Sequence, residues 1–537
     1  MHPYAAERFT EEEQDVLRRY FTNLDLPVFA LVNLPEVVKG ALFARYSRSP
    51  KSLRRLFLDE FVGDLDISGD ASIDATVGLK RAEELYDRVF YEYGDDSVAQ
   101  LGGVHLACEQ ASNVLTKVLE WGRLMAYLEQ STRYIAYDTR LEGRYRYYRD
   151  PKICESAMGA RYVGEMDRMF DTYASLVPAM QTWFAARYPN EEGDSDFVHR
   201  QAIRAKAFDA LRGLLPAASL SNVGIYGTGQ AYEALLLRMR AHALPEARAY
   251  AELMLEELRK VIPSFLKRVD APDRGGAWSA YLERNRVVME EVASSLFGRE
   301  EPEPRPSVTL VDFDPDGEDK VVAAMLYPYT HLPEDQVLAR VRRMSAEEKL
   351  AVVQGYAGER ANRRHRPGRA LERTAYRFDV LSDYGAFRDL QRHRMLTIEW
   401  QELTPRHGYV VPDAIGEAGY QERFEESLGR SADLYEALAP SFPAQAAYAV
   451  GLAFRVRYVL QMNAREAMHM LELRSGPQGH PEYRRLAQEM HRLIAEQAGH
   501  PSVAALMSFV DHGTYDLERL DAERRAAARR ATRTLPT

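Results

Sequence analysis

The chain has 537 residues, of which 46% are hydrophobic and 28% are charged, and its formal net charge at pH 7 is −10. This composition is typical of a globular protein rather than a disordered or fibrous one, and the length predicts two domains or two fused repeats. The negative charge argues against broad contact with nucleic acid, which requires an excess of Lys and Arg on some face.

The two cysteines, Cys108 and Cys154, lie in no CxxC pair. They are too few for a disulfide framework or a cysteine-built zinc site, so we expect a reducing, cytoplasmic environment and no metal centre. The N-terminus lacks the apolar core of a signal peptide, and no apolar run approaches the roughly 18 to 20 residues of a membrane span. The basic run near the C-terminus, ERRAAARRATR, is interpreted as a solvated end rather than a nucleic-acid site.

The expected elements, taken in chain order, form a helix-rich α+β protein. A short β-type run occurs at 27–34, and apolar residues at helical spacing predict amphipathic helices over 114–130 and 250–266. Further β-type runs follow at 307–313 and, after a turn, at 408–412.

Landmarks recur in the same order on either side of the polar, proline-rich stretch FGREEPEPRP. They are WGRLMAYLEQSTRY and EALLLRMR in the first half, and QRHRMLTIEWQELTP and EAMHMLELR in the second. Ordered self-similarity of this kind predicts a duplication. We therefore expect a first repeat over 1–297 with an insertion at about 138–208, a linker over 298–306 and a second repeat over 307–537.

Two polar segments of the second half are candidates for ligand binding. Arg392-His393-Arg394 offers adjacent donors that could hold a diphosphate or the electron-rich end of a flavin, although a solvated basic turn is the alternative. In 462–474, helical pitch puts Arg465, His469 and, roughly, Glu472 along one flank and Arg474 at the helix end. With Asn463 they form a polar cluster on an otherwise apolar helix, and buried polar groups need partners.

These segments resemble the motifs of the flavin-dependent thymidylate synthases (ThyX family). RHR, then Asn463-Ala464-Arg465, then an LR pair ending nine residues after that arginine follow the family pattern, but Thr397 and Glu402 stand where the family has two serines. The first half shows the complement. It has WGR in place of RHR, yet Glu129-Gln130-Ser131-Thr132-Arg133-Tyr134 resembles the nucleotide-binding end of the signature, and Arg212 resembles the phosphate-contacting arginine before a Leu-Pro pair.

The resemblance implies two tandem ThyX-like repeats, each with a β-sheet, that form a pseudo-dimer with one composite site. Family sites are built between subunits, so the first repeat would supply the nucleotide side and the second the flavin side. The implied nucleotide contacts are Glu129, Gln130, Ser131, Thr132, Arg133, Arg212 and Arg474; the implied flavin contacts are Arg392, His393, Arg394, Asn463, Arg465, His469 and Glu372. Arg474 would be the catalytic residue at the uracil carbonyl. The family's glutamine three residues before RHR is Asp389 here.

The implied activity is reductive methylation of dUMP to dTMP, with FAD as the cofactor and methylenetetrahydrofolate and NADPH as co-substrates. Two chains are expected to associate as a homodimer of pseudo-dimers. Two alternatives stay open. One is a flavin- or nucleotide-binding protein without catalysis, and the other is a related enzyme that transfers another one-carbon group to a uracil nucleotide.

Overall fold

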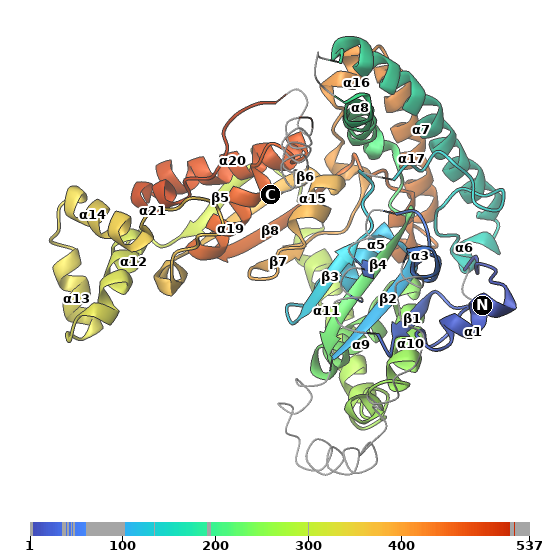
Figure 1. Ribbon diagram of the computed structural model, residues 1–537, viewed down its shortest axis with the longest axis horizontal. Coiled ribbons are helices and arrows are strands. Elements are labelled where there is room, and N and C mark those ends of the chain that lie inside the picture. Colours follow the sequence, from blue (N-terminus) through green and yellow to red (C-terminus); the bar gives the residue numbers. More distant parts are fainter. Residues whose placement is uncertain are drawn as a thin grey trace, which may run out of the picture. The chain divides into compact units, whose positions relative to one another are not determined.

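The computed structural model describes most of the chain, which divides into two compact units (Figure 1). The described residues are 4–34, 49–60, 103–133, 135–190, 195–298 and 300–515, with Lys39, Leu42, Phe43, Tyr46 and Leu520. Unit 1 comprises Met1–Ala174, Leu214–Pro302 and Glu426–Gly451; unit 2 comprises Ser175–Gly213, Glu303–Glu425 and Leu452–Thr537. Each unit thus contains a segment from the opposite half of the sequence. Tyr134 and the basic C-terminal run lie outside the described residues.

Unit 1 is built on a four-stranded antiparallel sheet in the order β1-β2-β4-β3. The strands are β1 (Val28–Leu31), β2 (Gly103–Ser112), β3 (Met125–Glu129) and β4 (Leu220–Thr228). The helices are α1 (Glu11–Leu17), α3 (Leu53–Glu60), α5 (Asn113–Leu119), α6 (Pro151–Cys154), α9 (Gly229–Arg240), α10 (Pro245–Arg259), η5 (Pro263–Leu266), α11 (Gly275–Phe297), α18 (Pro443–Ala446) and η9 (Ala447–Ala449). Helix α10 packs against β1, and α9 follows β4 directly.

Unit 2 repeats this sheet with strand order β5-β6-β8-β7. Its strands are β5 (Val308–Phe313), β6 (Ala375–Asp383), β7 (Thr397–Trp400) and β8 (Arg455–Asn463). Its helices are α8 (Asp196–Leu211), η4 (Arg212–Leu214, whose last residue is assigned to unit 1), α12 (Gly317–Leu326), η6 (Tyr327–Tyr329), α13 (Glu334–Val341), α14 (Ala346–Ala357), η7 (Arg369–Arg373), α15 (Tyr384–Leu390), η8 (Pro405–His407), α16 (Asp413–Glu417), α19 (Ala464–Arg474), α20 (Pro481–Glu496) and α21 (Pro501–Leu506). Helix α20 packs across β5 and β6 and against α19.

The shared topology confirms the predicted α+β fold and its two repeats. In each sheet a helix follows the second strand (α5 or α15) and another follows the fourth (α9 or α19). The side chains of Thr228 and Asn463 cap the second of these helices in the two repeats. Two long helices, α7 (Gly159–Arg187) and α17 (Gln421–Leu438), each begin in one unit and end in the other.

Several predicted elements are confirmed, and two are corrected. Strands β1 and β5 lie where β-type runs were expected, and 250–266 is α10 followed by η5, where Pro263 stops the helix. The helix predicted over 114–130 is wrong in its second half, since α5 ends at Leu119 and β3 pairs with β4 from Met125. The expected strand at 408–412 is reduced to a single bridge between Tyr409 and Phe454.

The stretch just before β5 is irregular. Residues 300–306 contain neither helix nor strand, and this stretch includes the change from unit 1 to unit 2 at Pro302. The repeat boundaries and the insertion remain predictions. None of the helices in the described ranges combines the length and the apolar character that crossing a bilayer requires.

A buried carboxylate joins three segments of the unit 1 core. Glu246 of α10 is fully buried and accepts hydrogen bonds from the backbone N–H of Ser112 at 2.9 Å, the Ser112 hydroxyl at 2.6 Å and the Tyr448 hydroxyl at 2.7 Å. Burial raises its pKa to about 7, although the three hydrogen bonds favour the charged form.

Replacing this carboxylate should therefore change how stability depends on pH. The raised pKa means that Glu246 favours the folded state below pH of about 4.3 and that this contribution is lost as pH rises towards 7, by up to about 1.4 kcal/mol per pH unit. Glu246→Gln cannot titrate, so its stability relative to the parent should improve between pH 4.5 and 7.5 in urea denaturation. Glu256→Gln, an exposed position on the same helix, is the control. Parallel pH profiles for parent and Glu246→Gln would contradict the assignment.

Candidate active site

Three guanidinium groups from different elements of unit 2 face the carboxylate of Asp389. Asp389 lies in the last turn of α15 and is largely buried. Its Oδ1 accepts a hydrogen bond from Arg392 and lies 3.5 Å from Nη1 of Arg474, while Oδ2 lies 3.7 Å from Nη1 of Arg212. We call Arg212, Arg392 and Arg474 the arginine cluster. All three were identified in the sequence, and the structure brings them together.

Arg212 reaches this position from the first half of the sequence because segment 175–213 belongs to unit 2. It is 5% exposed and begins η4, directly after α8. The guanidinium lies close to the backbone at Gly385, where a Cβ would lie 3.0 Å from its carbon. The next residue in the chain, Gly213, is also closely packed, since a Cβ there would lie 2.8 Å from Cβ of Ala453. Glycine at both positions therefore allows the fit.

A second carboxylate lies near the other side of Arg212. Oδ1 of Asp383 is 3.9 Å from Nη2 of Arg212, beyond hydrogen-bonding distance, and the same oxygen accepts the backbone N–H of Ala386 at the start of α15. Burial raises the pKa of Asp383 to about 6, while the positive charge of Arg212 opposes the rise. Among the described residues, Nη2 of Arg212 is a buried donor without a hydrogen-bond partner.

Arg474, the last residue of α19, is hydrogen-bonded to His393. Its Nε donates to Nε2 of His393 at 3.0 Å, and burial lowers the pKa of Arg474 although Asp389 raises it. His393 is itself buried, and its pKa falls well below the usual range, first because of burial and then because of the charge of Arg474. The imidazole is therefore neutral near pH 7.

His393, Glu466 and His469 bring three potential metal ligands within 4.8 Å of one another. The imidazole Nδ1 of His393 lies 3.1 Å from Oε1 of Glu466, and Nδ1 of His469 lies 3.0 Å from Nη2 of Arg366. Each of these ring nitrogens already has a partner. Burial, and then the charges of Arg366, Arg363 and Arg474, lower the pKa of His469 to about 4, and these charges also oppose a further cation. In the structure the group forms a hydrogen-bonded network beside the arginine cluster.

The remaining flavin-side candidates lie near this network in different roles. Arg465 donates to Glu372 at 3.2 Å, and Arg369 donates to the same carboxylate at 3.1 Å, so the pKa of Glu372 is lowered, mainly by Arg369. Arg394 is exposed. The amide oxygen of Asn463 caps α19 by accepting the N–H of Glu466 at 2.9 Å, so this oxygen serves the helix.

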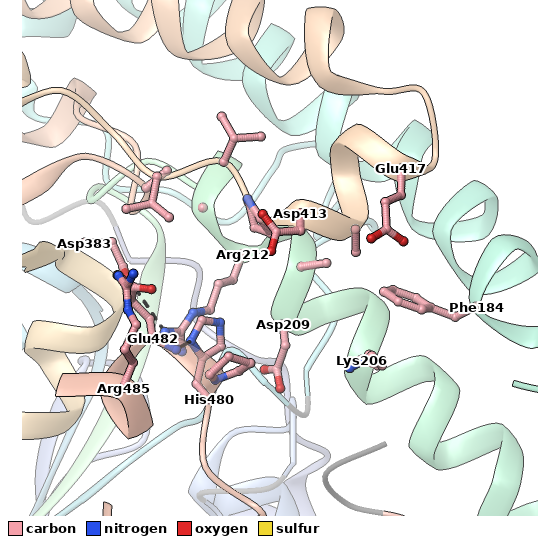
Figure 2. A pocket seen from close by; sticks show the side chains of 18 of the residues that line it. Phe184, Lys206, Asp209, Arg212, Asp383, Asp413, Glu417, His480, Glu482 and Arg485 are labelled. Carbon is pink, nitrogen blue, oxygen red and sulfur yellow. Dashed lines mark hydrogen bonds and ion pairs between the residues drawn. The ribbon is translucent and has the colours of Figure 1, made fainter. Parts of the chain in front are cut away.

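A cavity of about 600 Å³ in unit 2 lies beside Arg212 (Figure 2). Figure 2 shows Asp383, Glu482, Arg485 and His480 on one side of it, and Lys206, Phe184 and Glu417 on the other. Its size suits a small organic ligand. Of the residues identified in the sequence, Arg212 alone is among those that line it.

The candidates of the first repeat, residues 129–133, belong to unit 1 and are mostly buried. Oε2 of Glu129 lies 3.2 Å from Nζ of Lys117, and Nε2 of Gln130 donates to the carbonyl of Ser49 at 2.6 Å. The hydroxyl of Ser131 accepts the backbone N–H of Arg133 at 3.3 Å, and Thr132 is buried. Their contact with a nucleotide remains a prediction.

Both cysteines lack the features of a nucleophile. Cys108 is fully buried in β2, and burial raises the pKa of its thiol. Burial also raises the pKa of Cys154. Because the thiolate is the reactive form, neither residue is prepared for covalent attack.

Sequence reasoning missed two residues of the network, Glu466 and Arg366, and noted Asp389 only as a departure from a family pattern. Glu466 adjoins Arg465, but its burial against His393 depends on a contact across 73 positions. Arg366 belongs to the basic segment RRHRPGR, whose composition marks a cation-rich stretch without indicating what it contacts.

Comparison with known proteins gives consistent matches over most of the chain. The chain matches the family described as thymidylate synthase complementing protein in two segments, residues 47–264 and 309–500. A UPF0159 protein of Chlamydia muridarum is 40% identical over 528 residues, which cover 97% of this chain and 99% of that protein. A UPF0159 protein of Thermoplasma acidophilum is 33% identical over 512 residues, covering 90% and 97% respectively.

Removing the charge of Asp389 should leave the arginine cluster without its internal anion. We expect Asp389→Asn to lower the free energy of unfolding by roughly 1 to 3 kcal/mol in chloride buffer and to be restabilised by sulfate far more than the parent is, because the dianion can replace the carboxylate. Melting temperatures measured against sulfate concentration test this. Asp379→Asn, which removes a carboxylate paired with Arg457 on the sheet, is the matched control. An equal sulfate response in all three proteins would contradict the expectation.

Proposed function

We propose a specific reaction for this chain, which belongs to the family of thymidylate synthase complementing proteins. The proposed reaction is flavin-dependent synthesis of dTMP from dUMP, with methylenetetrahydrofolate as the carbon donor and NADPH as the reductant. Family membership supports a thymidylate synthase-like enzyme, and the finer assignment rests on the arrangement of the site.

The arginine cluster is the observation that carries the proposal. Arg212, Arg392 and Arg474 meet at one carboxylate, so the site is built to neutralise an anion. A nucleoside monophosphate provides a phosphate dianion and a pyrimidine ring that becomes electron-rich as C5 turns nucleophilic. Fixed positive charges stabilise both, and they do so more strongly where water is excluded.

The donor set also fits a flavin. Arg392, Arg394 and Arg465 provide guanidinium groups in unit 2, and His393 and His469 lie beside them with ring centroids 5.5 Å apart. When bound, FAD would supply the transfer of the one-carbon unit and of hydride. The protein's residues would bind and orient it. The raised thiol pKa of both Cys108 and Cys154 agrees with a route that needs no cysteine nucleophile.

The proposal assigns different roles to Arg212 and Arg474. Arg212 holds the phosphate, and Arg474, fixed by His393, directs its charge at a uracil carbonyl. The resemblance assigns further nucleotide contacts to residues 129–133, and this part rests on the sequence. We also propose that the protein acts in the cytoplasm as a homodimer; exposed apolar side chains on α11, such as Met289, Leu296 and Phe297, support association.

Asp389 favours one alternative, a related enzyme that transfers another one-carbon group to a uracil nucleotide. A glutamine amide both donates and accepts, whereas a carboxylate only accepts, so the pyrimidine edge recognised here can differ from that of the family. Product analysis decides between dTMP synthesis and this alternative. Incubation with dUMP, methylenetetrahydrofolate and NADPH should yield dTMP, and the absence of dTMP with every reductant would overturn the proposal.

The purified protein should be yellow, and the colour should depend on the second repeat. We expect Arg465→Ala to lose most of the bound FAD, because it removes a guanidinium beside the histidine pair, while Arg123→Ala keeps it. Visible absorption and the FAD released on denaturation measure this. Equal flavin content in both variants, or a colourless parent reconstituted with FAD, would contradict the assignment.

The arginine cluster should separate binding from chemistry. Arg212→Ala should weaken dUMP binding by roughly 1.5 to 3 kcal/mol with flavin retained, since it removes hydrogen bonds to a charged group. Arg474→Ala should lower the single-turnover rate more than it weakens binding. Titration through the flavin spectrum and product formation measure the two effects. Arg377→Ala, on the exposed face of β6, serves as control. Unchanged dUMP affinity in Arg212→Ala would remove Arg212 from the site.

A further inference from the structure

Glu466 is a buried acid beside the site to which neither the sequence motifs nor the proposed reaction gives a role. It lies in the first turn of α19, one residue after Arg465, and its carboxylate is 3.1 Å from Nδ1 of His393. On the opposite edge of the same imidazole, Nε2 receives the Nε–H of Arg474 at 3.0 Å. Glu466 and His393 are each 7% exposed, so water does not compete for these bonds.

The chemistry of the three groups fixes the direction of every hydrogen bond. A guanidinium has donors and no acceptor, so Nε2 of His393 must present its lone pair to Arg474. A neutral imidazole carries one proton, which is then on Nδ1 and is donated to Glu466. The chain Arg474 to His393 to Glu466 therefore has one consistent proton arrangement, whether the carboxyl group is ionised or not.

We propose that Glu466 is a positioning residue that holds His393 in its Nδ1–H tautomer and thereby fixes the guanidinium of Arg474 towards the nucleotide. The inference deepens the proposed function and rests on it for the identity of the nucleotide. Without Glu466, the buried Nδ1–H would lose its acceptor, and the Nε2–H tautomer, which places a proton against the Nε–H of Arg474, would compete. Arg474 would then lose the hydrogen bond at Nε that, together with its contacts with Asp389 and the ring of Tyr483, orients its guanidinium.

The charges around Glu466 come from three segments. Arg366 precedes η7, Arg394 follows α15, and Arg465 lies on α19; the neutral ring of His393 also faces it, and His469 lies nearby on the same helix. Burial raises the pKa of Glu466 to about 7, and the three arginines oppose the rise. As pH rises through this value, the ionised carboxylate becomes a stronger acceptor for His393. The hold on Arg474 should therefore tighten.

The tautomer of His393 can be read directly in the full-length protein. We expect ¹⁵N-histidine NMR to show His393 as the Nδ1–H form in the parent and in Glu466→Gln, whose amide oxygen can still accept. Glu466→Ala should shift this resonance towards the Nε2–H form or a mixture. Glu472→Gln is the matched control, because Glu472 is also a buried carboxylate of α19 but pairs with Arg360 at 2.6 Å. An Nε2–H imidazole in the parent, or an unchanged tautomer in Glu466→Ala, would overturn the proposal.

Kinetics give the second measurement. Glu466→Ala should lower kcat for nucleotide methylation by roughly 10- to 100-fold with a smaller change in KM, since a misplaced group costs mainly rate. Glu466→Gln, whose neutral amide oxygen still accepts, should keep kcat near the low-pH level of the parent and above that of Glu466→Ala. The rise of kcat/KM with an apparent pKa near 7 should be present in the parent and absent from Glu466→Gln. Equal pH profiles in parent and Glu466→Gln would count against the proposal.

The proposed dTMP synthesis and the positioning role of Glu466 can each fail separately. If Glu466→Ala does not fold, the tautomer in the parent and the pH profile of Glu466→Gln still decide the positioning role. If the NMR result is as expected but the parent makes no dTMP, the proposed function fails and the tautomer assignment stands. If dTMP forms at the same rate in parent and Glu466→Ala, the proposed function stands and the positioning role is wrong.

Discussion

The carboxylate of Asp389 allows three guanidinium groups to share one small, largely buried volume. Like charges at such separations repel strongly where water is scarce, and a central anion turns this repulsion into attraction. Three guanidinium groups thus face the one carboxylate of Asp389. The neighbouring histidines are neutral first because burial lowers the pKa of His393 and His469, and then because the arginine charges lower it further.

The exchange of segments between the two units determines which residues can meet. Arg212 comes from the first half of the sequence, yet it packs against Gly385 at the start of α15 in unit 2. This exchange brings residues from both halves of the sequence into one unit. The strand orders are identical, and both helices that follow the fourth strand keep a side-chain cap, whereas RHR occurs in one repeat and WGR in the other. The two repeats thus share a fold but differ in these motifs.

Several buried acids of unit 2 lie close to basic side chains. Asp383 and Asp389 lie on two sides of Arg212, Glu472 pairs with Arg360, and Glu466 accepts from His393. Glu472 and Glu466 replace water as the partners of Arg360 and His393, which reduces the freedom of these donors. An orientation fixed in advance is what electrostatic catalysis requires, because no reorganisation is then needed as charge develops.

The sequence by itself determined the features that depend on neighbouring residues. Helical periodicity predicted α10 and α19, β-type runs predicted β1 and β5, and short motifs singled out Arg392, Arg474 and Arg212. The segment 114–130 was misassigned because its apolar spacing fits a helix, whereas the strand β3 exists only through its pairing with β4, about a hundred residues further on. Only the tertiary structure decided that Arg212 meets Asp389 and that Glu466 faces His393. Those contacts depend on packing between segments that are distant in the sequence, and the residues next to Arg212 and Glu466 in the chain do not indicate them.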